Sequence, residues 1–309
     1  LDENIAKDRL IDAKMPKNLV SSEEKELCIF LYTIFQYYLE KAIESMNSDD
    51  LEKKEKAKKI LNSLMENSFV NLFRSNKIIF SCLNGILNFY LGLLTFGNED
   101  QTECEKHMMK SLDYFNTLPT MIKIRYVNFY QEIYNNLGIV FYNKGETKKG
   151  LQYLGKSEQM YKMFSDMTGY NITNNFSKFM IGCSQGFNND SSTDKLEFFN
   201  FYIDGGFNKK SFEHNYTLTI FYYAQAFTRL GFRKKAIKYC SQTLKRQVEH
   251  NEYDLKDTIV NCINLAEFYM ENQHFAQAEY VLIAAISLLP EDLNRKKKLR
   301  ASLQLQLGK

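Results

Sequence analysis

Apolar and small residues recur along this chain at helical spacing, and the same arrangement returns several times. The clearest copies lie between Thr217 and Pro290. In each copy, large apolar residues line one helix, a small residue interrupts them, and a second helix follows after a short turn. The matching positions are Ile220, Tyr223, Ala224, Phe227, Gly231, Ala236, Cys240 and Thr243 in the first copy, and Cys262, Leu265, Ala266, Tyr269, Ala278, Leu282, Ala285 and Pro290 in the second.

Two further copies lie upstream and share these small and apolar positions. They comprise Leu91, Gly92, Cys104, Met108 and Ser111, followed by Tyr134, Leu137, Gly138, Phe141, Gly145, Gly150, Leu154 and Ser157. This arrangement is the signature of the tetratricopeptide repeat, a helix–turn–helix unit of about 34 residues. The small residues let paired helices cross closely, and the large ones fill the groove between them. We therefore predict an all-α fold, a right-handed α-solenoid of tetratricopeptide-like helical hairpins.

The chain before these repeats also predicts helices. Ser21-Ser22-Glu23-Glu24 is a capping box that begins a helix running to about Met46, with an apolar stripe that includes Phe30, Phe35 and Tyr38. Ser48-Asp49-Asp50 ends that helix and caps the next, from Leu51 to about Asn67. The alternating lysines and glutamates of residues 52–59 indicate a solvated helix face.

These patterns divide the chain into four segments. Residues 1–75 are N-terminal helices that cap the array, and 76–164 and 212–309 hold tetratricopeptide-like repeats. Between them, residues 165–211 are rich in Asn, Ser, Gly, Asp and Phe, which predicts an irregular insert with one helix around 193–202. A last helix carrying Arg295–Lys298 is expected after Pro290. Because the chain opens on Leu1 rather than methionine, we expect a fragment of a longer protein.

Charge, hydropathy and cysteine content indicate which kinds of partner and compartment to expect. The formal net charge is +3, which creates no strong field for nucleic acid. We find no signal peptide and no apolar run long enough to span a bilayer, so no membrane insertion is expected. The six cysteines form no CxxC pairs and mostly occupy apolar helix positions, as reduced core thiols do. The chain is therefore expected in the cytoplasm.

No catalytic or cofactor motif occurs in the chain. Phosphate-binding loops, dinucleotide fingerprints, metalloprotease helices and nucleophile elbows are all missing from the sequence. The four histidines, among them His250 beside Glu249, lie far apart without metal-ligand spacing. We predict a protein that is not an enzyme, with no cofactor and no metal.

Stacked helical hairpins present a concave face lined by the first helix of each pair, which in such arrays recognises peptides or helices. Tyr222 and Gln225 flank packing positions on one such helix, and Asn264 lies next to Leu265 on another. The amides of Gln225 and Asn264 are expected to be free to bind a partner's side chain or backbone. Ordinary solvated polarity of the groove is the alternative interpretation.

Longer stretches carry a more specific resemblance. YYAQAF, FRKKAIKYCSQTLKRQVEHNEY and INLAEFYMENQHFAQAEYVLIAA, with NNLGIVFYNKGETKKGLQYLGKSEQMY upstream, resemble the KIF-binding protein family in order and spacing. The resemblance covers about residues 76–290 and is poor in the insert. It implies a non-catalytic α-solenoid whose concave face binds a kinesin motor domain and blocks its engagement with microtubules.

The resemblance also implies contact residues. Tyr222, Gln225 and Gln247 match family groove positions with suitable residue types, and Asn264 stands where the family has Thr. Lys245 and Arg246 are further candidates, which would meet acidic residues of the motor. Their alternative role is that of a basic helix C-terminus, which complements the helix dipole.

Two other functions stay open. One is a structural tetratricopeptide adaptor within a larger microtubule- or cilium-associated assembly, with other cytoskeletal proteins as partners. The other is a groove that captures a C-terminal carboxylate. It is the least favoured, because the first helices of the pairs offer few lysines.

Overall fold

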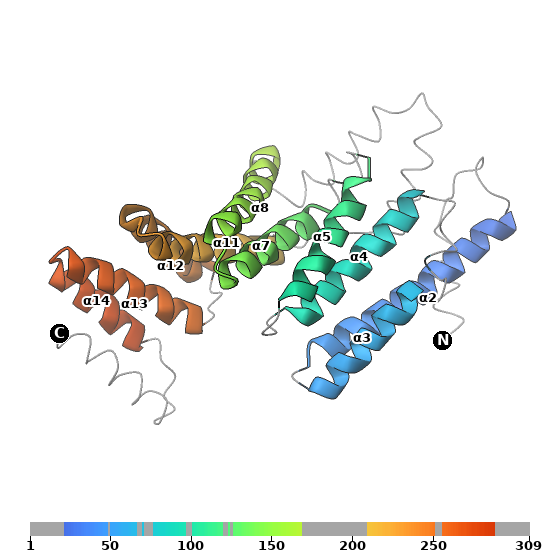
Figure 1. The fold of residues 1–309 in the computed structure, drawn as a ribbon, viewed down its shortest axis with the longest axis horizontal. Helices are drawn as coiled ribbons and strands as arrows, with labels where there is room; N and C mark the ends of the chain where they lie inside the picture. The colour runs from blue at the N-terminus through green and yellow to red at the C-terminus, as the bar shows by residue number, and fades with distance from the viewer. Residues whose placement is uncertain are drawn as a thin grey trace. The chain divides into compact units, whose positions relative to one another are not determined.

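The structure, a computed structural model, describes residues 22–48, 50–66, 70, 77–96, 101–119, 123, 126–168, 209–250 and 255–287. All the elements that these residues form beyond isolated turns are α-helices, and ten of them pack as successive hairpin pairs (Figure 1). The prediction of an all-α, tetratricopeptide-like fold is confirmed. The pairs are α2 (Ser22–Met46) with α3 (Leu51–Glu66), α4 (Lys77–Thr95) with α5 (Thr102–Asn116), α7 (Val127–Asn143) with α8 (Thr147–Thr168), α11 (Lys209–Arg229) with α12 (Arg233–His250), and α13 (Leu255–Glu271) with α14 (Phe275–Ser287).

The chain divides into two compact units. The first comprises Leu1–Asn136 and Met160–Lys209, and the second comprises Leu137–Gln159 and Lys210–Lys309. The division crosses α7 and α8, so the α7–α8 hairpin contributes residues to both units. The expected boundaries at residues 75, 164 and 211 stay a prediction.

Local polar contacts explain the connection of the first hairpin. The backbone N–H of Glu52 donates to the Asp50 carboxylate at 2.9 Å, and the Asp50 N–H donates to the Ser48 hydroxyl at 3.3 Å. The two bonds occupy the turn and the first turn of α3, as expected for a helix cap. The predicted cap at Ser48 and Asp50 is therefore confirmed.

The stripe predicted on α2 is only partly buried. Phe35 is 1% exposed, whereas Phe30 and Tyr38 remain 57% and 45% exposed. Because α3 covers one side of α2, only the part of the stripe that faces α3 contributes to the core. On α3 the charged residues of 52–59 are mostly exposed, as predicted, whereas the apolar Ala57 between them is fully buried.

Most residues of helix α4 are buried. A Cβ on Gly85 would lie 2.6 Å from the Phe115 ring, so α4 and α5 cross closely there. The buried amides of Asn84 and Asn88 donate to backbone carbonyls one turn earlier, at 2.9 Å each. The amide N–H groups of these two side chains thus find hydrogen-bond acceptors within their own helix, which is otherwise apolar.

The expectation that no apolar run could span a bilayer is wrong for α4. By length and composition Lys77–Thr95 is long and apolar enough, and 72% of its apolar window is buried inside the protein. A helix packed on both sides by neighbours is apolar all round for that reason. Its apolarity is accounted for by α3 and α5, which pack against it.

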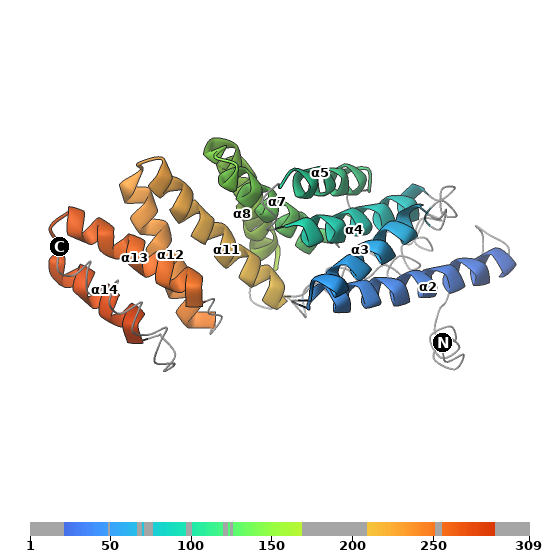
Figure 2. The ribbon, with the colours of Figure 1, turned by 60° about the horizontal axis from the view of Figure 1, so that its bottom comes forward.

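In the second unit, small residues set the approach of α7 to α8. A Cβ on Gly150 would lie 2.8 Å from the carbonyl oxygen of Gly138, and a Cβ on Gly138 would lie 2.7 Å from Leu154. Later hairpins use alanine at the same places: Ala224 and Ala236 are fully buried, as are Ala266 and Ala278 to within 1%. Figure 2 shows α13 and α14 side by side, with α12 packed against α13.

The repeat array continues from α8 to α11 although many residues separate them in sequence. The Ser157 and Thr219 hydroxyls lie 2.9 Å apart, and the Tyr223 hydroxyl donates to the Glu158 carboxylate at 3.2 Å. Arg229 donates to the Tyr142 carbonyl at 2.5 Å and stacks 3.8 Å from the Tyr142 ring centroid. Hence α11 packs on the α7–α8 hairpin as the next repeat would.

Some predictions fall elsewhere. Helix α8 runs to Thr168 and α11 begins at Lys209, so most of the expected insert lies outside the described residues, together with its predicted helix at 193–202. The leader before Ser22 and the helix expected after Pro290 lie outside them as well.

Candidate partner-binding face

Two first helices of neighbouring hairpins, α11 and α13, bring predicted contact residues together. The Asn264 amide Nδ2 donates to the Gln225 carbonyl Oε1 at 3.1 Å. Tyr222 lies on α11 one turn before Gln225, half-buried, with its ring edge-on to Tyr142 at 5.8 Å. Three candidates from the sequence therefore share one region, where an amide pair bridges adjacent repeats.

Gln247 occupies a different position from the other candidates. It lies on α12, the second helix of its hairpin, at the end of the buried stripe Ala236, Cys240, Thr243 and Gln247. Its side chain is 4% exposed, and its Oε1 accepts no hydrogen bond. Gln247 is thus an interior residue of the second unit, and its role in partner contact stays a prediction.

The two basic candidates differ in availability. Arg246 is already engaged on α11: its guanidinium forms a salt bridge with Glu213, and lies 4.6 Å from the Tyr216 ring centroid. Both charged side chains are less than 20% exposed, 19% for Arg246 and 15% for Glu213. Lys245, one residue earlier, is exposed. An acidic partner group would therefore have to displace Glu213 to reach Arg246, whereas Lys245 lies at the surface.

A further amide, Asn261, was not found from the sequence. It lies one turn before Asn264 on α13, is 0% exposed, and neither its Nδ2 nor its Oδ1 has a hydrogen-bond partner. Gln225 has the same deficit at its buried Nε2. The sequence did contain a signal for Asn261. It is a polar residue at a position where the repeat normally has a residue that packs between helices.

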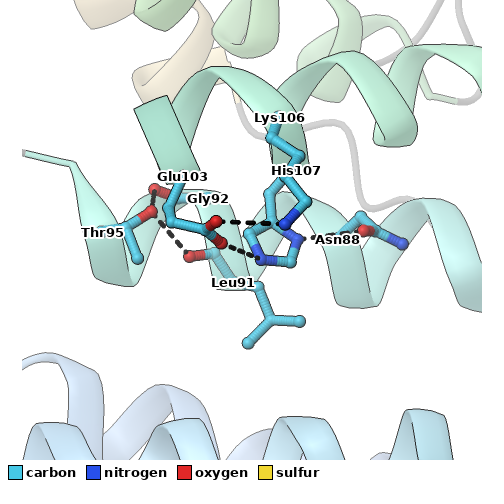
Figure 3. Close-up of polar contacts among 7 residues, drawn as sticks. All are labelled: Asn88, Leu91, Gly92, Thr95, Glu103, Lys106 and His107. Atoms are coloured by element: carbon cyan, nitrogen blue, oxygen red, sulfur yellow. Dashed lines mark hydrogen bonds and ion pairs between the residues drawn. The ribbon is translucent and has the colours of Figure 1, made fainter. Parts of the chain in front are cut away.

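His107 makes a structural contact in the α4–α5 hairpin (Figure 3). His107 Nδ1 lies 3.1 Å from Asn88 Oδ1, and its Nε2 lies 3.6 Å from a Glu103 carboxylate oxygen. Because the Asn88 Nδ2 is bound to the Asn84 carbonyl, Asn88 Oδ1 is an acceptor and His107 Nδ1 carries the proton. Burial lowers the pKa of His107, nearby lysines lower it further, and Glu103 opposes them.

Reactive and metal-binding groups do not gather in the part of the chain that the structure describes. There, no three His, Cys, Asp or Glu side chains are placed to hold a metal ion. The thiols of Cys82, Cys104, Cys240 and Cys262 are buried and form no disulfides. Burial raises the pKa of Cys240 to about 12 and that of Cys262 to about 11, so both are protonated thiols at neutral pH. The side chains of Cys28 and Cys183 lie outside the described residues.

Comparison with known proteins identifies relatives. The chain is 27% identical over 200 residues to the KIF-binding protein of Mus musculus, and 26% identical over 200 residues to that of Homo sapiens. It is 30% identical over 216 residues to the KIF-binding protein of Drosophila melanogaster. The chain is a distant homologue of the KIF-binding proteins. The resemblance seen in the sequence is thus confirmed.

The extent of the match matters. The match to the mouse and human relatives covers 65% of this chain and 29% of each relative. The match to the Drosophila relative covers 68% of this chain and 32% of that relative. The chain therefore matches about a third, or slightly less, of the length of these relatives. No protein-family model matches it.

Proposed function

We propose that this chain is a non-catalytic helical-repeat protein that binds a kinesin motor domain and thereby hinders the motor from engaging microtubules. The homology to KIF-binding proteins carries the proposal. The bridging pair of Gln225 and Asn264 supports it, since its hydrogen bond joins two neighbouring first helices and leaves the buried Gln225 Nε2 without a partner. The site of action would be cytoplasmic and cytoskeleton-associated.

The physical mechanism is a helix held against the face formed by α11 and α13. Tyr222 offers an aromatic edge, and the amides of Gln225 and Asn264 offer donors and acceptors with no charge to desolvate. A motor helix bound there would be sterically unavailable to tubulin. Lys245 contributes as an exposed cation, and would speed association more than it strengthens the complex.

Alanine substitution on this face tests the proposal. The wild-type chain is titrated with a purified kinesin motor domain, and the motor is sedimented with microtubules in the presence and absence of the chain. Gln225→Ala and Tyr222→Ala should each weaken binding by about 1–2 kcal/mol if they act as hot spots. Gln242→Ala, exposed on α12, is the matched control and should bind as wild type.

Two results would contradict the proposal. A folded Tyr222→Ala/Gln225→Ala double variant with wild-type affinity would remove this face from the interface. A wild-type chain that leaves the sedimented motor unchanged and instead stays with the microtubules after a salt wash would favour the structural adaptor.

A further inference from the structure

Positive charge is unevenly distributed along the chain. Residues 137–159 and 210–250, the portion of the second unit before α13, contain twelve Lys and Arg against four Glu. Their formal charge is therefore +8, whereas that of the whole chain is +3. The α13–α14 hairpin that follows has one Lys against one Asp and three Glu. The small net charge of the chain thus conceals one strongly basic region.

Three lysines are exposed on the first two turns of α12, namely Lys234, Lys235 and Lys238. None of them forms an ion pair with a residue that the structure describes. Lys235 Nζ lies 5.2 Å from the Phe227 ring centroid, and Lys238 Nζ lies 5.8 Å from that of Tyr239. These ring contacts orient the side chains and leave their charge unneutralised.

Two further lysines are exposed on the first turn of α8, Lys148 and Lys149. Lys149 Nζ lies 3.7 Å from the Phe141 ring centroid and 3.6 Å from a carboxylate oxygen of Glu146. Lys148 forms no ion pair within the described part of the chain. The start of α8 therefore repeats the arrangement seen on α12, with lysines beside aromatic rings at the surface.

Two contacts bring these groups of lysines to the same edge of the second unit. An open hollow of about 400 Å³ is lined by residues 145–149 and by Leu230. Beside it, Arg229 donates to the Tyr142 carbonyl. Since α12 begins at Arg233, three residues after Leu230, its lysines begin next to the hollow that Lys148 and Lys149 line. We call the five side chains the turn-edge lysines: Lys148, Lys149, Lys234, Lys235 and Lys238.

The chemistry of this edge favours carboxylates over phosphates. Arg binds phosphate through its planar guanidinium, whereas Lys is a flexible point charge. Both arginines near the hollow are engaged, Arg229 by the Tyr142 carbonyl and Arg233 by Glu271 at 3.2 Å. The cations that remain for a partner are lysines, which attract carboxylates without requiring a fixed geometry.

Nucleic acid and membrane surfaces fit this edge less well. Single-stranded nucleic acid stacks its bases on exposed aromatic rings, and a membrane surface takes up exposed apolar side chains. Among the described residues of 209–250, Phe232 is the one large hydrophobic side chain that is exposed, at 53%. The edge therefore offers charge with little apolar area.

We propose that the turn-edge lysines form a docking surface for an acidic peptide, an extended segment of a partner protein rich in Glu and Asp. Successive residues of an extended chain rise about 3.3 Å, so a run of carboxylates can reach several of these lysines at once. Lys149 would exchange Glu146 for a carboxylate of the peptide. The turn-edge lysines lie on second helices, so the inference does not depend on motor binding by the first helices α11 and α13.

Charge reversal on α12 tests the surface. A fluorescent polyglutamate peptide is titrated with the whole chain, and its anisotropy gives the Kd. Lys234→Glu/Lys238→Glu should weaken binding about tenfold or more, because attraction becomes repulsion. Lys53→Glu/Lys56→Glu on α3 is the matched control: both lysines are exposed, the net charge changes equally, and the Kd should stay that of wild type.

Lys148→Gln/Lys149→Gln tests whether the two hairpins form one surface. This variant should weaken peptide binding about threefold or more, since it removes two of the five cations. A wild-type Kd would exclude α8 and overturn the single surface. Tyr222→Ala/Gln225→Ala should bind the peptide as wild type does, which separates this surface from the face proposed for the motor.

Salt and competitors test the chemical class. Raising the salt concentration should weaken peptide binding, because exposed charges are screened. Single-stranded RNA or phosphatidylserine vesicles that displace the peptide more effectively than unlabelled peptide does would show recognition of phosphate groups, and would overturn the inference. No binding at low salt, or an equal loss in the α3 control, would overturn it as well. A thermal melt accompanies each variant, and Lys234→Gln/Lys238→Gln, with a smaller loss expected, replaces the reversal should that fail to fold.

Discussion

The hydroxyl of Ser157 donates to the hydroxyl of Thr219, 2.9 Å away and 62 residues later in the chain. The direction follows from Thr219, whose own proton is given to the Asn215 carbonyl at 2.8 Å. Both hydroxyls belong to fully buried residues. A single polar contact thus fastens α11 to α8 inside the core.

This direction predicts unequal costs for the two partners. Ser157→Ala leaves Thr219 bonded to Asn215 and should cost about 1 kcal/mol of unfolding free energy. Thr219→Val leaves the buried Ser157 hydroxyl without its acceptor and should cost more, up to about 3 kcal/mol. The double variant should lose less than the sum. Urea unfolding measures all three, and strictly additive losses would argue against the bond.

The turn between α13 and α14 contains a strained residue that substitution should relieve. Gln273 has φ 60°, where the preceding repeats have glycine, Gly145 at 84° and Gly231 at 74°. Its turn has the helix-ending bonds of the Gly231 turn: His274 N–H donates to the Tyr269 carbonyl at 2.8 Å. Gln273→Gly should therefore stabilise the protein by about 1 kcal/mol.

Calorimetry in parallel on Gly231→Gln provides the matched comparison. This variant places a side chain on the same left-handed backbone and should lower the Tm. If Gln273→Gly lowered the Tm too, its side chain would be contributing contacts that outweigh the backbone strain.

Two glycines at helix crossings should differ in their tolerance of alanine. An added Cβ at Gly150 meets the Gly138 carbonyl oxygen at 2.8 Å, and backbone cannot move aside without separating α7 from α8. At Gly92 the nearest atom is the terminal methyl of Met108 at 2.9 Å, which can rotate away. We expect Gly150→Ala to lose about 3 kcal/mol and Gly92→Ala about 1 kcal/mol. Chemical denaturation would show the order, and equal losses would contradict it.

His107 should make stability depend on pH. Burial lowers its pKa in the folded chain below the ordinary value of 6.5, so the unfolded chain takes up the proton first as pH falls. The contribution is fully present above pH 6.5 and is lost as pH falls through the folded pKa. In His107→Asn, whose amide can still donate to Asn88, the fall in Tm from pH 7.5 to about 5.5 should be smaller than in wild type. An unchanged pH profile would exclude His107 as its source.

Much of the fold follows from local sequence. The capping residues Ser48 and Asp50 mark a helix start, and Gly145 and Gly231 mark turns, because each requirement is met within a few residues. The hairpin pairing follows from the spacing of small and large residues. The sequence also predicted that Gln225 and Asn264 lie on one face, and the structure joins them by a hydrogen bond.

Other features depend on contacts that local patterns do not contain. Arg246 pairs with Glu213, 33 residues earlier, so its availability could not be judged from the basic run around it. Gln247 and Asn261 are buried although both are polar, and residue type alone did not predict this. The prediction that no segment is apolar enough to span a bilayer was wrong for α4. Apolarity alone cannot distinguish a helix covered by protein from one covered by lipid.

The direct packing of α11 on α8 has a consequence for tracing this architecture in other chains. Since Thr219 and Tyr223 contact α8 directly, the pairing of α8 with α11 does not require a fixed number of residues between Thr168 and Lys209. A search that requires a constant period would end at α8 and overlook α11 to α14. A search that matches the segment around Ser157 and the segment around Thr219 separately, with any number of residues between them, would also find α11 to α14.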